Sequence, residues 1–321
     1  YPYLETTTAP AQGGLLENSP RLDWSNGVPA VLVEEQRTNA VYNSEYILSN
    51  GLTNGNLLSW DSSIANPEGY NGATIFQSDS YVRRSGMLTG LSTGDKISYS
   101  IFAKSDSDAN FVLGGQFGGE DATFNVNTRT LVSQGAACDS YEIIPFANGW
   151  HRYVVNITYQ NSIGNGSNYS YFRWASNTEP IYLWGWQVER DATTPSSYIP
   201  TYGTSQTRSN EVISDNFDIP TTATIYNSFY SDTAETVFVL DQVFNVAEGL
   251  NKVAIAFSPT AVKISVGGSI VANATGTYDT SSLTNIQLGS DNGSDYSNAP
   301  ISGFYVFPEF LTDEELNSLT D

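Results

Sequence analysis

Short segments rich in aromatic and β-branched residues, each bounded by Gly, Asn, Asp or Ser, dominate this sequence and are typical of β-strands. In "ISYSIFA" (97–103), Ile97, Tyr99, Ile101 and Ala103 share one face of an extended chain, which is the period of two of a strand. Helical periodicity is almost absent. We therefore predict an all-β chain of antiparallel β-sandwiches, since no βαβ alternation is present.

The strand signals fall into two runs, and we expect two tandem sandwich modules. The polar, turn-rich stretch "TYGTSQTRSNEVISDNFDIP" separates the runs, and we place the boundary near Ile213. The predicted organisation is an N-terminal strap (residues 1–39), a first module (40–213) and a second module (214–321). The first run comprises "KISYSIFAK" (96–104), "NFVLGGQF" (110–117), "WHRYVVNITY" (150–159), "SYFRWA" (170–175) and "IYLWGWQVER" (181–190). The second comprises residues 222–231, 236–244, 251–276, 285–290 and 301–308.

Turn and cap residues refine this prediction in the second module. Ser258-Pro259 and Gly267-Gly268 are expected to turn successive hairpins. At the C-terminus, "LTDEELNSLT" predicts a short helix, because Thr312 can cap it and Glu315 lies three residues on, as in a capping box.

Composition narrows the classes of partner. The formal net charge is -21, from 13 Lys plus Arg against 34 Asp plus Glu, which disfavours nucleic acid and anionic lipid. One cysteine and one histidine leave no intrachain disulfide and few metal sites of the usual type. No apolar run is long enough to insert in a membrane. The chain also lacks an initiator Met, so we expect a processed product or a segment of a longer protein.

Several motifs occur in the order found in a known family. "PRLDW", "GVPAVLVEEQRTN", "ISYSIFAK", "NGWHRYVVNIT" and "IYLWGWQVERDATTPSSYIPT" together resemble bacteriophage tail-fibre and virion proteins, whose middle portion is similar to a carbohydrate-binding-module jelly roll. The C-terminal stretches "NKVAIAFSPTAVKISVGG" and "ISGFYVFPEFLTDEELNSLT" resemble the end of a laminin-G or concanavalin-like module. The resemblance implies a virion component, homo-oligomeric and in the family often trimeric, that contacts other virion proteins and host-surface polysaccharide.

The leading hypothesis is thus a non-enzymatic virion structural or adhesion protein, on a tail fibre or capsid surface, that binds host glycans. Two alternatives remain open: a polysaccharide-degrading enzyme on the same scaffold, and an architectural fibre or cement protein without a ligand.

Aromatic side chains are the best candidates for glycan contact, because sugar rings stack on flat aromatic faces. Trp60 and Tyr70 lie in the loop-like "LLSWDSSIANPEGYNG" and are the predicted platform. In "YLWGWQVER", alternation puts Tyr182, Trp184, Trp186 and Val188 on one buried face. Three further residues complete the predicted carbohydrate-binding set, with the last two in a polar groove: Arg173, Gln187 and Glu189.

The stretch "PRLDWSNGVPAVLVEEQRTN" gathers two arginines and three acids. Glu34 and Glu35 point to opposite faces of a strand and cannot face one sugar together, so a glycosidase pair is disfavoured. We interpret the group as a structural clasp in which arginines pair with acids and Asn39 bonds backbone groups at a bend. Its predicted members are Arg21, Asp23, Glu34, Glu35 and Arg37.

A lyase hypothesis rests on the single histidine. Some jelly-roll lyases abstract a proton with His or Tyr while Arg and Gln neutralise the carboxylate of a uronate, and His151, Tyr153, Arg173 and Gln187 supply those types. A lone His without a placed partner is a weak signal, so we favour a half-buried sheet residue.

Two turns carry enough oxygen ligands to be considered for calcium. These are "SDSDAN" (105–110) and "GSDNGSDY" (289–296), with Asp291, Asn292 and Asp295 as the candidate ligands. Neither fits the EF-hand spacing, and Asp and Asn are common in turns for backbone reasons alone. We therefore expect no required cofactor.

Overall fold

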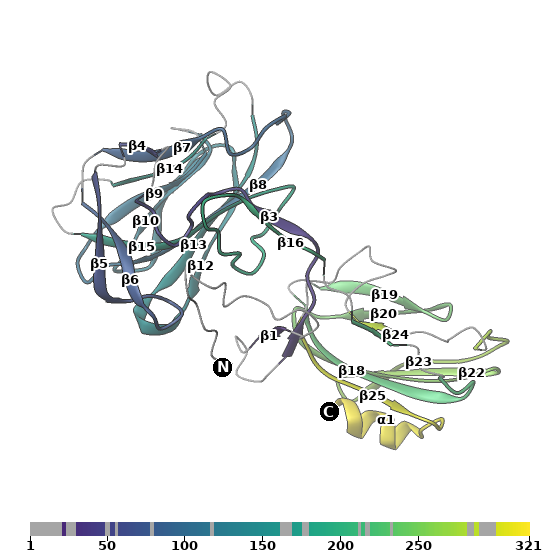
Figure 1. Cartoon of the computed structure of the whole chain (residues 1–321). Helices are drawn as coiled ribbons and strands as arrows, with labels where there is room; N and C mark the ends of the chain where they lie inside the picture. The colour runs from purple at the N-terminus through teal and green to yellow at the C-terminus, as the bar shows by residue number, and fades with distance from the viewer. Residues whose placement is uncertain are drawn as a thin grey trace. The chain divides into compact units, whose positions relative to one another are not determined.

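The computed structural model (Figure 1) describes residues 21–23, 30–48, 52–54, 57–77, 80–115, 119–160, 169–174, 180–210, 213–215, 219–231, 234–280, 286–288 and 300–321. Two compact units make up the described chain. Residues 37–208 form the first unit, and residues 209–321 together with 21–23 and 30–36 form the second. No helix in these described ranges is long and apolar enough to cross a membrane.

The first unit contains two six-stranded antiparallel sheets. The first sheet runs in the order β11 (Thr130–Gln134), β10 (Asp121–Asn125), β9 (Asn110–Gly114), β14 (Tyr169–Trp174), β7 (Tyr81–Ser85) and β4 (Leu52–Thr53). The second sheet runs in the order β12 (Cys138–Pro145), β13 (His151–Thr158), β8 (Lys96–Lys104), β15 (Ile181–Arg190), β6 (Asn71–Phe76) and β5 (Leu58–Ala65). A short pair, β3 (Arg37–Asn39) with β16 (Gln206–Arg208), and a 3-10 turn at Ala147–Gly149 complete it.

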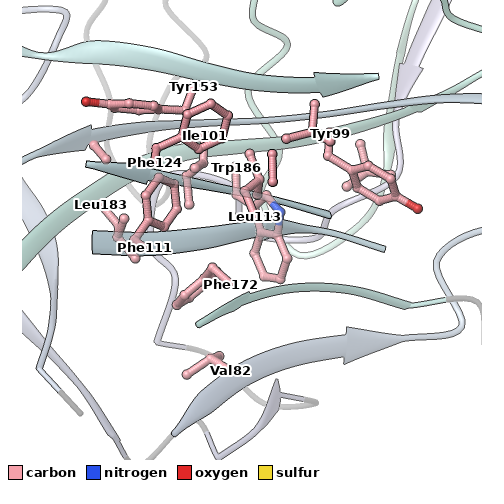
Figure 2. Packing of buried hydrophobic residues seen from close by; sticks show 14 of the residues in the cluster. Val82, Tyr99, Ile101, Phe111, Leu113, Phe124, Tyr153, Phe172, Leu183 and Trp186 are labelled. Atoms are coloured by element: carbon pink, nitrogen blue, oxygen red, sulfur yellow. The ribbon is translucent and has the colours of Figure 1, made fainter. Parts of the chain in front are cut away.

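One apolar core joins these two sheets. Figure 2 shows Phe111, Phe124 and Phe172 of the first sheet close to side chains of the second. The predicted alternation in β8 is confirmed, because Ile97, Tyr99, Ile101 and Ala103 all belong to this core. Phe102 points to the opposite face of the second sheet, where it packs with Ala73, Trp150 and Trp184. Both faces of β8 are therefore buried.

A β-bulge at Gly185 overturns the predicted face assignment in "YLWGWQVER". Tyr182 and Trp184 pack in the cluster of Phe102, but Trp186 and Val188 lie in the core between the sheets. The pairing of β15 with β8 shifts between Trp184 and Gln187, and Gly185 has φ +64. One extra residue reverses the side-chain direction, so a strict period of two fails here. Trp184 is buried, as predicted.

The second unit is built on a seven-stranded antiparallel sheet. Its order is β1 (Arg21–Asp23), β2 (Ala30–Leu32), β25 (Ile301–Phe307), β18 (Ala223–Ser231), β21 (Gly249–Ser258), β22 (Ala261–Val266) and β23 (Ser269–Thr275). Two short pairs accompany it: β17 (Ile213–Asp215) with β24 (Ile286–Leu288), and β19 (Glu235–Val239) with β20 (Gln242–Val246). Phe244 of β20 and Phe257 of β21 share one apolar cluster. The unit is thus a second layered β structure.

The predicted turns and helix of this unit are confirmed. Gly267-Gly268 connects β22 and β23, with both glycines at positive φ. Pro259-Thr260 connects β21 and β22, one residue later than the expected Ser258-Pro259. Helix α1 (Asp313–Thr320) begins with a capping box, in which Glu315 N donates to Thr312 Oγ1 and Thr312 N donates to Glu315 Oε2 (2.8 Å). Leu316 of this helix packs against the sheet face that carries Ala254 and Ala256.

Two segment predictions were wrong. "TVFVLDQVF" is not one strand, because a turn at Leu240-Asp241, both at positive φ, divides it into β19 and β20. The loop-like stretch around Trp60 forms the β5–β6 hairpin instead. The broader prediction is confirmed: the described chain is mostly β, with antiparallel sheets paired as sandwiches and one short C-terminal helix.

Gly185→Ala should destabilise the first unit by about 3 kcal/mol, because a β-carbon there would combine positive-φ strain with a clash. That β-carbon would lie 2.7 Å from Phe102 Cδ2. Gly203→Ala is the matched control, since Gly203 also has positive φ but has open space around it. Urea unfolding followed by tryptophan fluorescence reports this unit, which holds five of the six tryptophans. Equal losses in the two variants would contradict a steric role for Gly185.

Candidate functional site

The turn between β5 and β6 is held by hydrogen bonds of Asn66 and presents two side chains. Asn66 Oδ1 accepts hydrogen bonds from the backbone N–H groups of Glu68 (3.0 Å) and Tyr70 (3.1 Å). Asn66 N also donates to Tyr70 O (2.7 Å). These bonds hold the turn while leaving Glu68 and Tyr70 exposed, with Tyr70 at 69%.

Trp60 lies beside this turn, on β5, where it pairs with Thr74 of β6. Its half-buried ring stands 4.8 Å from the ring of Tyr46, centroid to centroid, at 55°. The ring also passes over Gly72, where a β-carbon would lie 2.2 Å from Trp60 Cζ2. Tyr46 is 50% exposed. The structure thus places Trp60, one of the two predicted platform residues, against a ring that the sequence did not single out.

Two carboxyl groups, those of Glu45 and Glu68, belong to the same chain segments as Tyr46 and Tyr70. Burial first, and then the charge of Glu68, raise the pKa of Glu45 to about 7. Burial also raises the pKa of Glu68, although the residue as a whole remains exposed. Tyr202 OH donates a hydrogen bond to Glu45 Oε1 (3.1 Å), and Tyr202 is itself 38% exposed. Within the described chain, neither glutamate has a Lys or Arg partner.

We call this group the aromatic–carboxyl patch, and it consists of Glu45, Tyr46, Trp60, Glu68, Tyr70 and Tyr202. Three separate segments of the chain supply it. Its rings offer flat faces to a sugar, and its carboxyl groups can accept hydrogen bonds from hydroxyls or bind a cation. The signal in the sequence was an acid beside or near a tyrosine, in "SEY" and "PEGY".

Gln187 and Glu189 lie inside the first unit and fix the segment that leads to Tyr202. Gln187 Oε1 accepts from Ile199 N (2.7 Å), and Glu189 accepts from both the backbone N–H (2.9 Å) and the hydroxyl of Ser196. Their exposed fractions are 0% and 1%. A sugar has no access to side chains so placed, and the expected polar groove does not form around them.

Arg173 is exposed but belongs to the first sheet, on β14, opposite Tyr81 of β7. Arg83 of β7 lies over the ring of Tyr81 at 5.6 Å. Trp60 lies on the second sheet, on β5. Arg173 and Trp60 therefore lie on different sheets of the first unit.

The predicted clasp is described only in part. Arg21 and Asp23 pair through backbone with β2, and their side chains lie outside the described residues. Glu34 is buried, Glu35 is half-buried, and Arg37 donates to Asp191 O (2.9 Å). The ion pairs of the clasp thus stay a prediction.

The expectation for Asn39 is confirmed. Its Nδ2 donates to Trp186 O (3.2 Å) and Ile199 O (2.9 Å), and its Oδ1 accepts from Val41 N (3.1 Å) and Val188 N (3.2 Å). The side chain is fully buried. It therefore fixes β15 and the segment after it to the chain near β3.

Of the four lyase candidates only His151 and Tyr153 lie together, both on β13 with ring centroids 6.5 Å apart. Tyr153 lies in the core, and its hydroxyl donates to Val126 O (3.2 Å). Burial, and then the charge of Arg129, lower the pKa of His151, so its neutral form is favoured. Gln187 is buried and Arg173 lies on the other sheet. The described geometry does not assemble a proton-abstracting site around His151.

The predicted calcium ligands Asp291, Asn292 and Asp295 lie outside the described residues. In the other acid-rich turn, Asn125 Nδ2 donates to Asp108 Oδ1 and to Asn110 Oδ1 (2.9 Å). The ranges that the structure describes contain no cluster of three or more acidic, His or Cys residues suited to a metal ion.

The chain matches no protein-family model, and no curated protein is significantly similar to it.

Glu45→Gln should stabilise the first unit at pH 8.5 by up to about 3 kcal/mol and have little effect near pH 4.5. The folded chain keeps the proton on Glu45 up to about pH 7, whereas the ordinary pKa of a glutamate, as in an unfolded chain, is 4.5. The folded state thus binds more protons in this window, and the free energy of unfolding falls as pH rises through it. Urea unfolding at several pH values measures this. A gain that is equal at both pH values would refute the assignment.

Gly72→Ala should displace the Trp60 ring, because the added methyl would overlap it and Gly72 has φ +136. We expect a loss of about 2–4 kcal/mol in stability and a red-shifted tryptophan emission. Gly86→Ala, at positive φ in open space, is the control. A crystal structure of Gly72→Ala with Trp60 unmoved would contradict the packing role of Gly72.

Proposed function

We propose that this protein is a non-enzymatic adhesion or structural component of a virion surface, and that its aromatic–carboxyl patch binds a host-surface saccharide. The observation that carries the proposal is the group of partly exposed rings, Tyr46, Trp60, Tyr70 and Tyr202, beside two carboxyl groups. Stacking on rings with polar groups at their edge is how proteins commonly hold sugars. The resemblance to tail-fibre proteins supports the virion assignment.

The strand connections of the two units are also part of what we propose. We infer a jelly-roll connection of strands in the first unit and a laminin-G or concanavalin-like arrangement in the second. A fibre that displays several copies of the chain, as a trimer for example, would let weak sites act together, because linked sites raise the effective concentration. Other virion proteins would be its structural partners.

A second candidate function is hydrolysis of a glycoside by Glu45 and Glu68. The pKa of Glu45, about 7, favours this, because glycosidases need one protonated and one ionised carboxyl group. Release of reducing ends by the wild type, lost in both Glu45→Gln and Glu68→Gln, would establish an enzyme. Binding without release would leave adhesion.

Tyr70→Ala should weaken binding to a bacterial-surface glycan by about tenfold or more, because it removes a stacking ring. The variant should fold normally, since Tyr70 is mostly exposed and its hydrogen bonds in the turn use backbone atoms. An array of bacterial surface polysaccharides, followed by titration of the best ligand, measures the loss.

The matched control is Tyr305→Ala, which removes a similarly exposed ring (60%) from the second unit. Equal binding by wild type, Tyr70→Ala and Tyr305→Ala would remove the patch from consideration. Absence of any bound glycan would favour the architectural alternative.

A further inference from the structure

The aromatic–carboxyl patch lacks a positive charge. Tyr202 OH bonds Glu45 at 3.1 Å, and burial, followed by the negative charge of Glu68, raises the pKa of Glu45. Hydrogen bonding by Tyr202 satisfies one oxygen of Glu45 but brings no charge. Elsewhere in the first unit carboxylates do have basic partners, as Asp95 has in Arg190 (2.9 Å) and Asp139 in Lys96 (3.0 Å). Among the described residues, the two patch glutamates have none.

The rings of the patch lack a cation as well. The same unit places guanidinium groups over aromatic rings at several points, such as Arg84 over Tyr42 (5.1 Å) and Arg152 over Phe102 (5.7 Å). Within the described part of the chain, no Lys or Arg lies over Tyr46, Trp60, Tyr70 or Tyr202. Aromatic faces next to carboxylates form the usual receptor for an ammonium group, which gains from both the ring quadrupole and the negative charge.

The charge of the whole chain acts in the same direction. A net charge of -21 repels polyanionic glycans and attracts cationic ones. Uncharged hydroxyls alone would leave the repulsion between Glu45 and Glu68 in place. A cation bound between them would relieve it, so binding and ionisation of Glu45 should favour each other.

We propose that the ligand of this patch is a saccharide with a cationic ammonium substituent, such as a free amino sugar, and that its ammonium group binds between Glu45 and Glu68 with its sugar face on the neighbouring rings. This inference rests on the proposed saccharide-binding function and specifies the class of sugar. An N-acetylated or acidic sugar would not supply the charge.

Three matched probes test the inference. They are β-1,4 glucosamine oligomers of one length in N-acetylated, free-amino and N-trimethylated form, where the last has a charge that does not titrate. Titration calorimetry at pH 8 should give at least about tenfold tighter binding of the trimethylated than of the acetylated oligomer. The free-amino oligomer should exceed the acetylated one at pH 7.

Variants assign the effect to the patch. Glu45→Gln and Glu68→Gln should each remove most of the preference for the trimethylated oligomer, whereas Glu314→Gln changes the net charge equally from helix α1 and should keep it. The affinity of the wild type for the trimethylated oligomer should fall as pH decreases through about 7, because Glu45 then gains a proton. The titratable groups that interact with Glu45 are Glu68, Tyr198 and Tyr202.

The outcomes separate this inference from the proposed function. Equal binding of acetylated and trimethylated oligomers, abolished by Tyr70→Ala, would overturn the cationic ligand and retain saccharide binding. A preference that survives Glu45→Gln and Glu68→Gln would overturn the inference by showing attraction to the overall charge. No binding of any probe would overturn it too, and the polysaccharide array would then decide the proposed function alone.

Discussion

In the segment 196–201, Ser196, Ile199 and Thr201 are buried against the second sheet, and buried peptide groups must be hydrogen-bonded because water cannot reach them. The first unit meets this requirement with side chains. Asn39 and Gln187 bond the two backbone groups of Ile199, and Glu189 bonds Ser196. Arg152 adds a bond from Nη1 to Ser196 O (2.8 Å). The polar residues in the interior are thus the means by which a non-repetitive segment is held on a sheet.

This attachment determines what the surface can do. Tyr198 packs 4.7 Å from Trp184 and 5.7 Å from Phe102, measured between ring centroids, and its hydroxyl bonds Ser44 Oγ (2.6 Å). Ser44 in turn bonds Thr201, so residues 44–46 and 198–202 are held together. Glu45 and Tyr202 meet at this point. A binding surface that is fixed before its ligand arrives loses less conformational entropy on binding.

How far the sequence predicts this molecule depends on how local each feature is. The strands β8 and β15 have the bounds expected from "KISYSIFAK" and "IYLWGWQVER", and the helix has the expected cap, since composition and capping act within a few residues. The exposure of Tyr70 was predictable because aromatic residues in a polar, turn-rich stretch commonly lie at the surface, whereas Trp60 is half-buried on a strand.

The features that the sequence did not predict all depend on contacts between distant segments of the chain. The bulge at Gly185 depends on Phe102 and Tyr198, which lie close only in the folded chain. The pairing of Glu45 with Glu68 and Tyr202 depends on three segments converging, and no spacing in the sequence records it. Gln187 and Glu189 were expected at the surface because polar side chains usually lie there, yet a covering segment made them interior partners.

The Trp60 ring can occupy its position only because residue 72 is a glycine and has no side chain. Because any β-carbon there would occupy the volume of the Trp60 ring, these two positions are not free to diverge independently. In chains descended from a common ancestor, a larger residue at position 72 should appear together with a smaller one at position 60. Such paired replacement would reshape this face of the β5–β6 hairpin while the sandwich beneath it stays the same.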